Sequence, residues 1–590
     1  MASSTSASFS RPSRASTGLG GSRNLGGDES QLLQLIWYGL TRSGESRPST
    51  ARSETKSKYS MAAKLIIAAL VVVAIGRRAF GNANRRPVKR VAVVGGGIAG
   101  AGAAYSLRKA GIEAVLFEKK PKIGGNAKAF TWNVEGHKVD TGLAVLAYPH
   151  EYFHSYMALL KELGMSEGAL HELRYFVAEK NYRGPTPKPA DGLECVFAHD
   201  EDFKPAEWLK QDLEKWKQLV TFVGKVNAFF SPSDYKSLYR MSIANPLNLI
   251  PLRQLCRMYG ISDYFWERVF VPVHTSTFLE VEMDTIPAVM AELLGDMVPF
   301  DKIPEMRAWE TTAYEVFARM LKLWPKDAVR TSCAVEKVEF IFAKDGTMDC
   351  VVYHEDTPDG QPGEVFDAVI FACSAPAAEA ILKKTRPSVA SVLSNPTEFF
   401  ISQLEGFLLR NTMYTVDRDK TFETGVVHSD GSVFPEKYRK QLLEKHCNYM
   451  VVNGDKPSDV ENHFIMSSWA PTANEPHVKG KKAMLVSYNC AEKTDKIEAE
   501  WTVTSRDAHP CLTITQMAFS IAVWPFLQGA RNRQVYYCGS AFTPGNGHDL
   551  SLLSGFVVAS ELGAPYPFPN TANGIKDFHA LRRMMLLFWA

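Results

Sequence analysis

Residues 89–100 read KRVAVVGGGIAG, a short β-branched run that leads directly into a glycine-rich turn and then into residues of helical character. This order of strand, turn and helix is typical of a dinucleotide-binding βαβ unit. In such a unit Gly95 permits the tight turn, Gly97 lets the backbone approach a pyrophosphate, and Gly100 lets the helix pack closely against the strand. The amino end of the helix supplies the field that phosphate groups prefer. The sequence therefore predicts a phosphate-binding turn followed by a helix over residues 99–110.

A second strand supports this interpretation of the turn, because a GxGxxG pattern alone is common by chance. Residues 113–117 (EAVLF) are apolar after the first position and end in Glu118, eighteen residues beyond Gly100. A carboxylate at that distance can accept hydrogen bonds from both hydroxyl groups of a ribose. The carboxylate therefore makes a dinucleotide the expected ligand of the turn.

Further motifs follow Glu118 in order. They are residues 124–126 (GGN), a predicted strand and hairpin starting at 331–338 (TSCAVEKV), and residues 535–540 (VYYCGS), followed by a last turn at 545–550 (GNGHDL). An acidic residue followed by a double glycine, together with these later motifs, resembles the flavoprotein superfamily of amine oxidases, phytoene desaturases and related FAD enzymes. The resemblance implies FAD contacts at Gly95, Gly97, Ile98, Ala99, Gly100, Glu118, Lys119, Gly124, Gly125, Asn126, Val335, Gly539, Ser540, Asp549 and Leu550.

The same resemblance implies the fold class and the domain order. We expect an α/β fold in which a doubly wound Rossmann-type FAD-binding domain is interleaved with an α+β substrate domain, and 590 residues are enough for both. The expected segments are a leader at 1–60, a hydrophobic anchor at 61–80, the FAD-binding domain at 88–150, 325–395 and 530–565, the substrate domain at 151–324 and 396–529, and a C-terminal tail at 566–590.

The last glycine motif brings two polar residues to the expected flavin. In the resembling enzymes the amino end of a helix lies under the ring and stabilises its reduced, more negative form. Asp549 stands where those enzymes usually carry Glu, and His548 precedes it. We expect His548 to donate or accept a proton and Asp549 to position its neighbours, with helix capping as the alternative role of Asp549.

Two departures from the superfamily bear on the substrate. Amine oxidases generally carry an aromatic residue just before the acidic residue of the last motif, where it holds the amine against the flavin, and this chain has Gly547 near that place. A glycine pair expected after Trp309 is replaced by residues 310–314 (ETTAY). An amine substrate is therefore not expected. No cysteine stands where some relatives bond the flavin covalently, which implies noncovalent FAD.

The middle and the end of the chain resemble predicted FAD-binding proteins associated with cyclopropane fatty acid synthesis. This resemblance implies a lipid substrate without naming a reaction. A turn-stabilising hydrogen bond explains His428 and Asp430 as well as a catalytic role does. The matching segments are residues 139–142 (VDTG), 428–430 (HSD), 467–469 (SSW), 509–510 (HP), 524–526 (WPF) and 529–533 (GARNR).

Residues 150–330 read mainly as helices, with apolar residues at helical spacing in 205–223 and 286–294. Residues 264–278 are rich in aromatic side chains, which fits either a lipophilic tunnel or an ordinary helical core. We expect an enzyme that transfers hydride between flavin N5 and a lipophilic, unsaturated fatty acyl or polyene substrate. The alternatives are a redox-neutral double-bond isomerase of polyunsaturated fatty acids or carotenoids, and a membrane-tethered scaffold that has lost FAD.

The charge of the chain is unevenly distributed. The formal net charge is +3, but the first ninety residues hold fifteen basic and four acidic residues, a net charge of +11, which leaves −8 for the rest. A nucleic-acid groove needs basic residues in the folded part, so no nucleic-acid partner is expected. Residues 1–60 are rich in Ser, Thr and Arg, which is typical of a transit segment or a disordered tail.

Residues 65–76 (LIIAALVVVAIG) form an uninterrupted apolar run that ends at Arg77 and Arg78. A helix that starts at Met61 would be roughly 24 Å long, which is short of a bilayer core of roughly 30 Å. The run predicts a membrane anchor, or a cleaved signal segment as the alternative. The basic residues after it would hold the body on the cytosolic or stromal face of an endoplasmic reticulum or plastid membrane.

The nine cysteines are scattered singly, without a CxxC pair. This spacing predicts neither a metal site nor a disulfide framework. Unpaired thiols in apolar runs are typical of buried, reduced cysteines and favour a reducing compartment for the body.

Overall fold

A computed structural model describes residues 87–586 with internal gaps, and all of these residues belong to one compact unit. The expected leader (1–60) and anchor (61–80) lie outside the described residues. In the part of the chain that is described, no helix is long and apolar enough to cross a bilayer. The gaps are residues 127–131, 135–136, 140–146, 182–191, 233, 238–241, 243, 279–282, 309–312, 343–347, 359, 387–395, 415–422, 430–433, 446–447, 453–459, 466–482, 489–500, 507–508 and 530–533.

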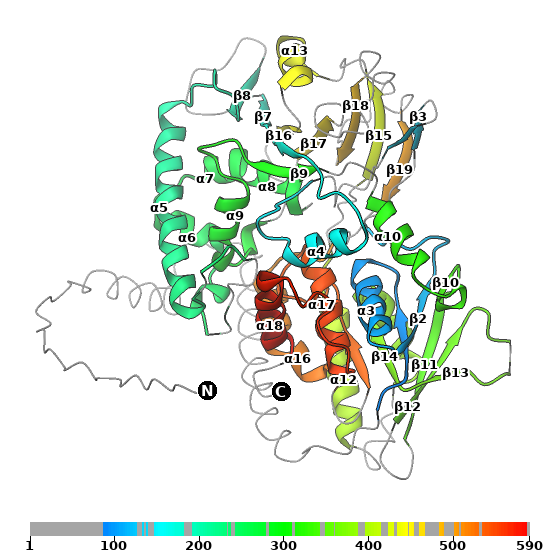
Figure 1. Cartoon of the computed structure of the whole chain (residues 1–590). Helices are drawn as coiled ribbons and strands as arrows, with labels where there is room; N and C mark the ends of the chain where they lie inside the picture. Colours follow the sequence, from blue (N-terminus) through cyan, green and yellow to red (C-terminus); the bar gives the residue numbers. More distant parts are fainter. Residues whose placement is uncertain are drawn as a thin grey trace, which may run out of the picture. The chain divides into compact units, whose positions relative to one another are not determined.

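A five-stranded parallel sheet forms the first half of the fold (Figure 1). Its order is β10-β2-β1-β14-β20, and its central strands are apolar and buried, as expected for a parallel sheet that is covered on both faces. Because the strand order reverses at β1, the crevice in which doubly wound sheets bind nucleotides lies at the carboxyl end of β1. The predicted fold class is confirmed. The strands are β1 (Arg90–Val94), β2 (Glu113–Glu118), β10 (Val329–Thr331), β14 (Ala368–Phe371) and β20 (Val535–Tyr537).

Helices α3 (Ile98–Lys109) and α17 (His548–Glu561) lie side by side in the core of this half (Figure 1). Helix α18 (Ala572–Leu586) packs against α17 and buries Phe578, Leu581 and Met585, which recur at helical spacing. The segment expected as a C-terminal tail therefore carries a core helix. The other helices that contribute to this core are α4 (His154–Glu162) and α10 (Ala313–Lys322).

A small antiparallel sheet follows β10. It consists of β11 (Val335–Phe342), β12 (Met348–His354) and β13 (Glu364–Phe366). The strand predicted around residues 331–338 is divided between β10 and β11, because Ser332 turns the chain with a φ of 49°. Helices α11 (Ala375–Lys383) and α12 (Pro396–Asn411) come after β14.

A seven-stranded mixed sheet, in the order β19-β15-β18-β17-β16-β7-β8, carries the second half of the fold. Its β16 and β7 are parallel, and the other neighbours are antiparallel. Residues 150–330, which we expected to be mainly helical, thus supply two strands of this sheet, β7 and β8. The strands are β7 (Tyr175–Lys180), β8 (Leu193–Ala198), β15 (Glu423–Ser429), β16 (Asn448–Val452), β17 (Val460–Ile465), β18 (Ala483–Tyr488) and β19 (Trp501–Arg506). Smaller sheets contain β3 (Trp132–Val134), β4 (His137–Val139), β5 (Ala147–Tyr148), β6 (Leu170–Glu172) and β9 (Glu305–Ala308).

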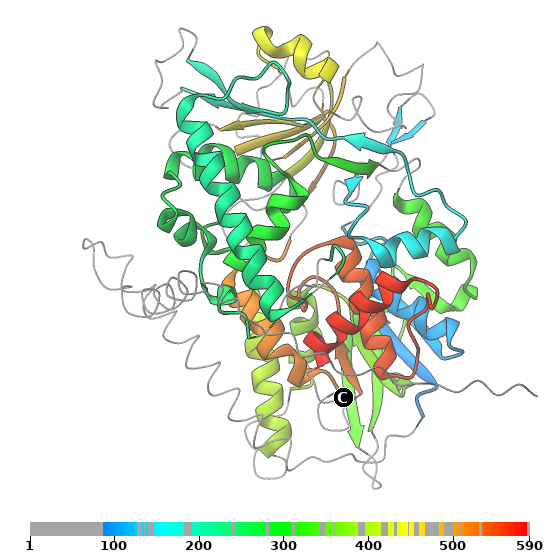
Figure 2. The same cartoon turned by 60° about the vertical axis from the view of Figure 1, so that its left-hand side comes forward.

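Helices accompany this sheet, and Figure 2 shows the longest of them, α5 (Glu207–Phe230), beside the shorter ones. The helix predicted from residue 205 is α5, and it continues beyond the predicted end at residue 223. It buries Leu209, Trp216 and Leu219. The remaining helical segments include α6 (Leu252–Met258), α7 (Asp263–Phe265), a π-helical turn at Trp266–Phe270, α8 (Val271–Phe278), α9 (Ala291–Met297), α13 (Glu436–Lys445), α15 (Ile514–Ala522) and α16 (Trp524–Leu527).

Candidate dinucleotide site

The glycine loop after β1 is too crowded for side chains at two of its positions. Gly95 has a φ of 111°, and a Cβ there would lie 2.8 Å from the carbonyl oxygen of Ala372 at the end of β14. A Cβ on Gly100 would lie only 2.0 Å from the carbonyl oxygen of Gly95. Both glycines therefore allow strand, turn and helix to approach one another, as the sequence predicts.

Gly97 differs from these two glycines, because the space around it is open. It precedes α3 with extended backbone angles, and a Cβ on it would meet nothing nearer than Gly125 Cα at 3.8 Å. The predicted double glycine lies against this point, since Gly124 N–H donates to the carbonyl oxygen of Gly96 at 2.8 Å. Gly125 itself has a φ of 57°. Two bare stretches of backbone therefore face each other at the amino end of α3, where the amides of Ile98, Ala99 and Gly100 precede the first intrahelical donor.

Glu118 lies at the end of β2 and is buried. Its two carboxylate oxygens accept backbone N–H groups, one from Gly96 and one from Lys120, each at 2.8 Å. These contacts fix the carboxylate beside the glycine loop, at the position where a ribose would follow a pyrophosphate. The side chains of Lys119 and Asn126 are exposed around it.

The corner between β10 and β11 borders the same carboxylate. Cys333 N–H donates to the carbonyl oxygen of Glu118 at 3.0 Å, and Ser332 N–H donates to that of Lys120. Val335 begins β11 directly after this corner and is largely buried. The structure thus brings Val335, one of the expected FAD contacts, to the strand end that carries Glu118.

The closing motif reaches the glycine loop from the other side. A Cβ on Gly539 would lie 3.5 Å from Ala99 Cβ, and Gly539 N–H donates to Ser554 Oγ of α17 at 2.9 Å. Ser540 is half-buried, and Leu550 is buried. The first and last motifs are therefore neighbours, although more than four hundred residues separate them in the sequence.

Helix α17 begins at His548 behind Gly547, whose φ of 151° suits only glycine. Asp549 is fully buried, and its Oδ1 accepts the backbone N–H of Tyr156 in the first turn of α4 at 2.6 Å. Asp549 therefore caps a neighbouring helix. Sequence reasoning missed Tyr156, because nothing in the pattern of α4 marks it as a partner of α17.

The imidazole of His548 packs edge-on against the ring of Tyr156, with 4.6 Å between centroids. It is buried, and no described residue forms a hydrogen bond with its Nε2. Burial lowers the pKa of His548 from its ordinary value to about 3, since the charged form would lose its hydration. His548 is therefore neutral near pH 7.

The residues of this site fit an ADP-containing cofactor. They offer an open backbone cradle at Gly97 and Gly125, a helix amino end and a fixed carboxylate, which match a pyrophosphate and a ribose. Gly96 also belongs to the site, although it is not among the expected FAD contacts. Its place inside the glycine motif could have indicated this. The side chain of His428 is not described, and Asp430 lies outside the described residues.

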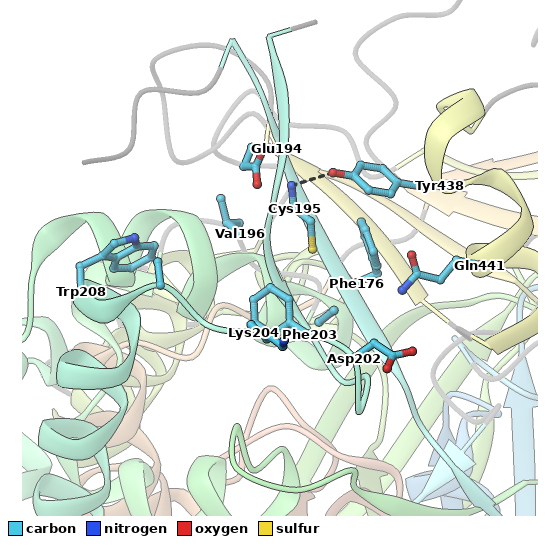
Figure 3. A pocket seen from close by; sticks show the side chains of 12 residues that line it. Phe176, Glu194, Cys195, Val196, Asp202, Phe203, Lys204, Trp208, Tyr438 and Gln441 are labelled. Carbon is cyan, nitrogen blue, oxygen red and sulfur yellow. Dashed lines mark hydrogen bonds between the residues drawn. The ribbon is translucent and has the colours of Figure 1, made fainter. Parts of the chain in front are cut away.

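A separate cavity of about 400 Å³ opens beside the seven-stranded sheet (Figure 3). Aromatic side chains of Phe176, Phe203, Trp208 and Tyr438 contribute to its wall, and the Tyr438 hydroxyl accepts the backbone N–H of Cys195 at 3.2 Å. No strand of the parallel sheet contributes to its lining, so it is distinct from the glycine-loop site.

The sequence comparisons each cover a third of the chain or less. Residues 93–163 match the family described as NAD(P)-binding Rossmann-like domain. A probable zeta-carotene desaturase of Synechococcus elongatus is 27% identical over 206 residues, which cover 33% of this chain and 39% of that protein. An L-amino acid oxidase of Cerastes cerastes is 29% identical over 154 residues, which cover 25% of this chain and 28% of that protein. The matched segments are thus less than half of either relative, and both relatives are redox enzymes by name.

The fold comparison extends over most of the chain. A solved structure of putrescine oxidase bound to putrescine matches with a TM-score of 0.53 and 13% sequence identity, covering 80% of this chain and 98% of that one. The chain therefore has the fold of the amine oxidases. At this identity the likeness concerns the fold and not the substrate.

Proposed function

We propose that this chain is an FAD-dependent oxidoreductase that binds FAD without a covalent bond and acts on a lipophilic, unsaturated fatty acyl or polyene substrate. The observation that carries the proposal is the meeting of three distant motifs at the amino end of α3, namely Gly97, Gly125 and Gly539. Bound FAD would supply a centre, flavin N5, that accepts or returns a hydride equivalent.

The residues of the first half would bind and orient the cofactor. The free amides at the amino end of α3 would hold the pyrophosphate, and the open space at Gly97 would let it approach the backbone. Glu118 would accept hydrogen bonds from the ribose hydroxyl groups. These bonds would replace part of those that it now accepts from the N–H groups of Gly96 and Lys120. The amino end of α17 would lie toward the flavin and stabilise negative charge on it.

His548 and Asp549 would act at the amino end of α17. Because burial keeps His548 neutral, it would hold its one ring proton at Nε2 and donate a hydrogen bond there, or accept one at Nε2 as the other tautomer. A second proton would leave a buried charge. Asp549 would act as a positioning residue, since its carboxylate ties α17 to Tyr156, the ring on which His548 packs.

The substrate class rests on two observations. The matched desaturase is named for a carotene, which is a polyene. Gly547 carries no side chain at the place near which amine oxidases hold an aromatic residue, so the chain lacks that means of pressing an amine against the flavin. The resemblance to proteins associated with cyclopropane fatty acid synthesis points in the same direction, toward a lipid.

The proposal extends to the membrane. A basic leader with net charge +11 and the apolar run 65–76 favour a chain tethered to a plastid or endoplasmic reticulum membrane, with its body on the stromal or cytosolic face. Such a tether would bring the site to a lipid substrate. Neither a nucleic-acid partner nor an amine substrate is part of this proposal.

The test begins with the purified full chain after desalting. We expect a yellow protein that releases FAD on denaturation, and the Glu118→Gln variant should retain less of it, because an amide accepts fewer hydrogen bonds than a carboxylate. The protein should then oxidise an unsaturated lipid anaerobically only when an electron acceptor is added. A colourless chain that takes up no added FAD would instead support the scaffold. Turnover without an acceptor and without a change in substrate mass would identify an isomerase.

A further inference from the structure

Three residues with metal-binding side chains meet at the edge of the candidate cofactor site, where β10, β11 and the end of β12 come together (Figure 1). Cys333 Sγ lies 3.4 Å from His354 Nδ1, and His354 Nδ1 lies 3.9 Å from Asp356 Oδ2. The three ligand atoms are all within 4.8 Å of one another. None of the three residues has a part in the function proposed above.

The backbone holds this cluster in place. Glu355 N–H donates to the carbonyl oxygen of Ala334 at 2.9 Å, which fixes Cys333 opposite His354 and Asp356. The turn that carries the other two ligands is closed twice, because Thr357 N–H donates to the carbonyl oxygen of His354 at 2.8 Å and Thr357 Oγ1 accepts His354 N–H at 3.1 Å. The path of the backbone therefore brings the three residues together.

The spacing suits a tetrahedral ion. Bond lengths of about 2.3 Å to sulfur and about 2.0 Å to nitrogen or oxygen place tetrahedral ligand atoms roughly 3.3 to 3.6 Å apart. The distance between Cys333 Sγ and His354 Nδ1 falls in this range, and a small rotation of the Asp356 side chain would bring its carboxylate into it. One thiolate, one imidazole and one carboxylate form a donor set that zinc accepts.

The surroundings of His354 can support a metal ligand. Its Nε2 lies 3.7 Å from Glu364 Oε2 and 3.3 Å from Arg330 Nη1, and Arg330 itself pairs with Glu364. Zinc binding at Nδ1 requires the tautomer that carries the proton at Nε2. Arg330, which can only donate, would then turn fully to Glu364, and Nε2–H would face the Glu364 carboxylate. The Asp356 side chain is 68% exposed, which leaves a hydrated cation a route from solvent.

We propose that Cys333, His354 and Asp356 bind one zinc ion, with a water molecule as the fourth ligand. The Cys333 thiol loses its proton to solvent as the sulfur binds the ion. The bound ion joins the corner between β10 and β11 to the end of β12 and stabilises that part of the fold. This proposal does not depend on the proposed oxidoreductase activity, because the three side chains bind the ion themselves and Cys333 borders the cofactor site only through its backbone N–H.

The test measures metal binding by the full chain, prepared without an affinity tag and stripped with a chelator. Calorimetry with zinc should give one site per chain, and cobalt added as a probe should develop the absorption of a thiolate-bound ion. Zinc should also raise the melting temperature. We expect Asp356→Asn to weaken zinc binding at least tenfold and Cys333→Ser to remove the thiolate-dependent cobalt absorption.

Two controls make the test decisive. Glu336→Gln removes an exposed carboxylate from the neighbouring strand β11, and Cys256→Ser removes a buried thiol on α6; both should bind zinc like the parent chain. Asp356 is exposed, so its variant should fold even if Cys333→Ser does not. Absence of zinc binding, or equal affinity in Asp356→Asn and Glu336→Gln, would overturn the proposal. The same measurements on flavin-free and flavin-loaded chains separate this outcome from that of the proposed function.

Discussion

The glycines of the first loop serve different purposes, and the spaces around them show which. At Gly100 a methyl group would run into the backbone of Gly95, whereas at Gly97 the nearest atom would lie 3.8 Å away. Gly97 also has backbone angles that alanine adopts readily. The protein alone therefore requires Gly100, whereas the open space at Gly97 is where the proposed cofactor would approach the backbone.

This difference gives a prediction for two alanine variants. Gly97→Ala should fold with a free energy of unfolding within about 1 kcal/mol of the parent, and yet bind FAD at least tenfold more weakly, a loss of about 1.4 kcal/mol. Gly100→Ala should lose about 2 kcal/mol of stability, because the helix must move away from the loop. Urea unfolding of the flavin-free chains and FAD titration distinguish the two. Full flavin binding by Gly97→Ala would contradict the proposed pyrophosphate position.

The buried His548 makes a prediction about acid stability. Its pKa in the folded chain is about 3, below its ordinary value, so the unfolded chain binds the proton first as the pH falls. Stability should therefore decrease below about pH 6.5 and continue to decrease until about pH 3, with a slope from this group approaching about 1.4 kcal/mol per pH unit. In the His548→Asn variant the free energy of unfolding should decrease less steeply with falling pH, because the contribution of this histidine is missing. Urea unfolding between pH 7 and pH 4 measures it, and His579→Asn, which changes an exposed histidine, should follow the parent curve.

At the scale of elements, the crossing of α3 and α17 determines how the first and last motifs meet. A Cβ on Gly555 would lie 2.2 Å from the carbonyl oxygen of Ala99, and one on Gly102 would lie 2.6 Å from a methyl group of Leu552. Small residues on both helices therefore permit a contact close enough to bring Gly539 beside Ala99. The geometry of the cofactor site thus depends on residues that need not touch the cofactor.

Substitution at this crossing should affect both stability and binding. We expect Gly555→Ala to lower the free energy of unfolding by about 2 kcal/mol, because a backbone carbonyl cannot yield as a flexible side chain can. FAD affinity should fall as well, since the helices separate. Gly224→Ala on α5 is the matched control: its Cβ would meet only the end of the Glu292 side chain, and alanine favours a helix by up to about 1 kcal/mol. Equal melting temperatures for the two variants would show that the crossing is not close.

At the scale of the whole molecule, α18 ties the end of the chain to the region expected to hold the substrate. Asp577 on α18 is fully buried, and its carboxylate contacts His154 Nδ1 at 2.6 Å, Tyr235 Oη at 2.9 Å and Ser237 Oγ at 2.6 Å. These partners lie on α4 and on the segment after α5. A single carboxylate therefore joins three parts of the chain.

Removing this carboxylate should weaken the whole fold. We expect Asp577→Ala to lower the free energy of unfolding by about 3 kcal/mol, because it leaves buried donors without an acceptor. Asp577→Asn should cost less, since one amide oxygen still accepts. The exposed ion pair between Asp234 and Lys576 lies nearby, and Asp234→Asn should change stability by less than about 0.5 kcal/mol. Equal effects of Asp577→Ala and Asp234→Asn in urea unfolding would contradict the structural role of Asp577.

The amino-acid sequence alone was sufficient to predict features that depend only on neighbouring residues in the chain. The βαβ unit around Gly95, the carboxylate at Glu118 and the glycine before α17 each depend on a short run of neighbours, whose φ angles and burial follow from residue type. For the same reason the α/β fold class and most of the candidate cofactor residues could be predicted. Each of these motifs is a contiguous piece of backbone, and its residue types are set by one local need, such as a positive φ or a close approach of two backbones.

Only the tertiary structure decided which distant residues meet. That Asp549 caps α4, that α18 belongs to the core, and that Cys333 faces His354 all depend on helix packing and on strand register. The scattered cysteines predicted no metal site, because a ligand set spaced by twenty-one residues shows no local pattern until a hairpin closes. Such contacts arise from the sum of many weak packing interactions across the chain, so they cannot be predicted from any single segment of the sequence.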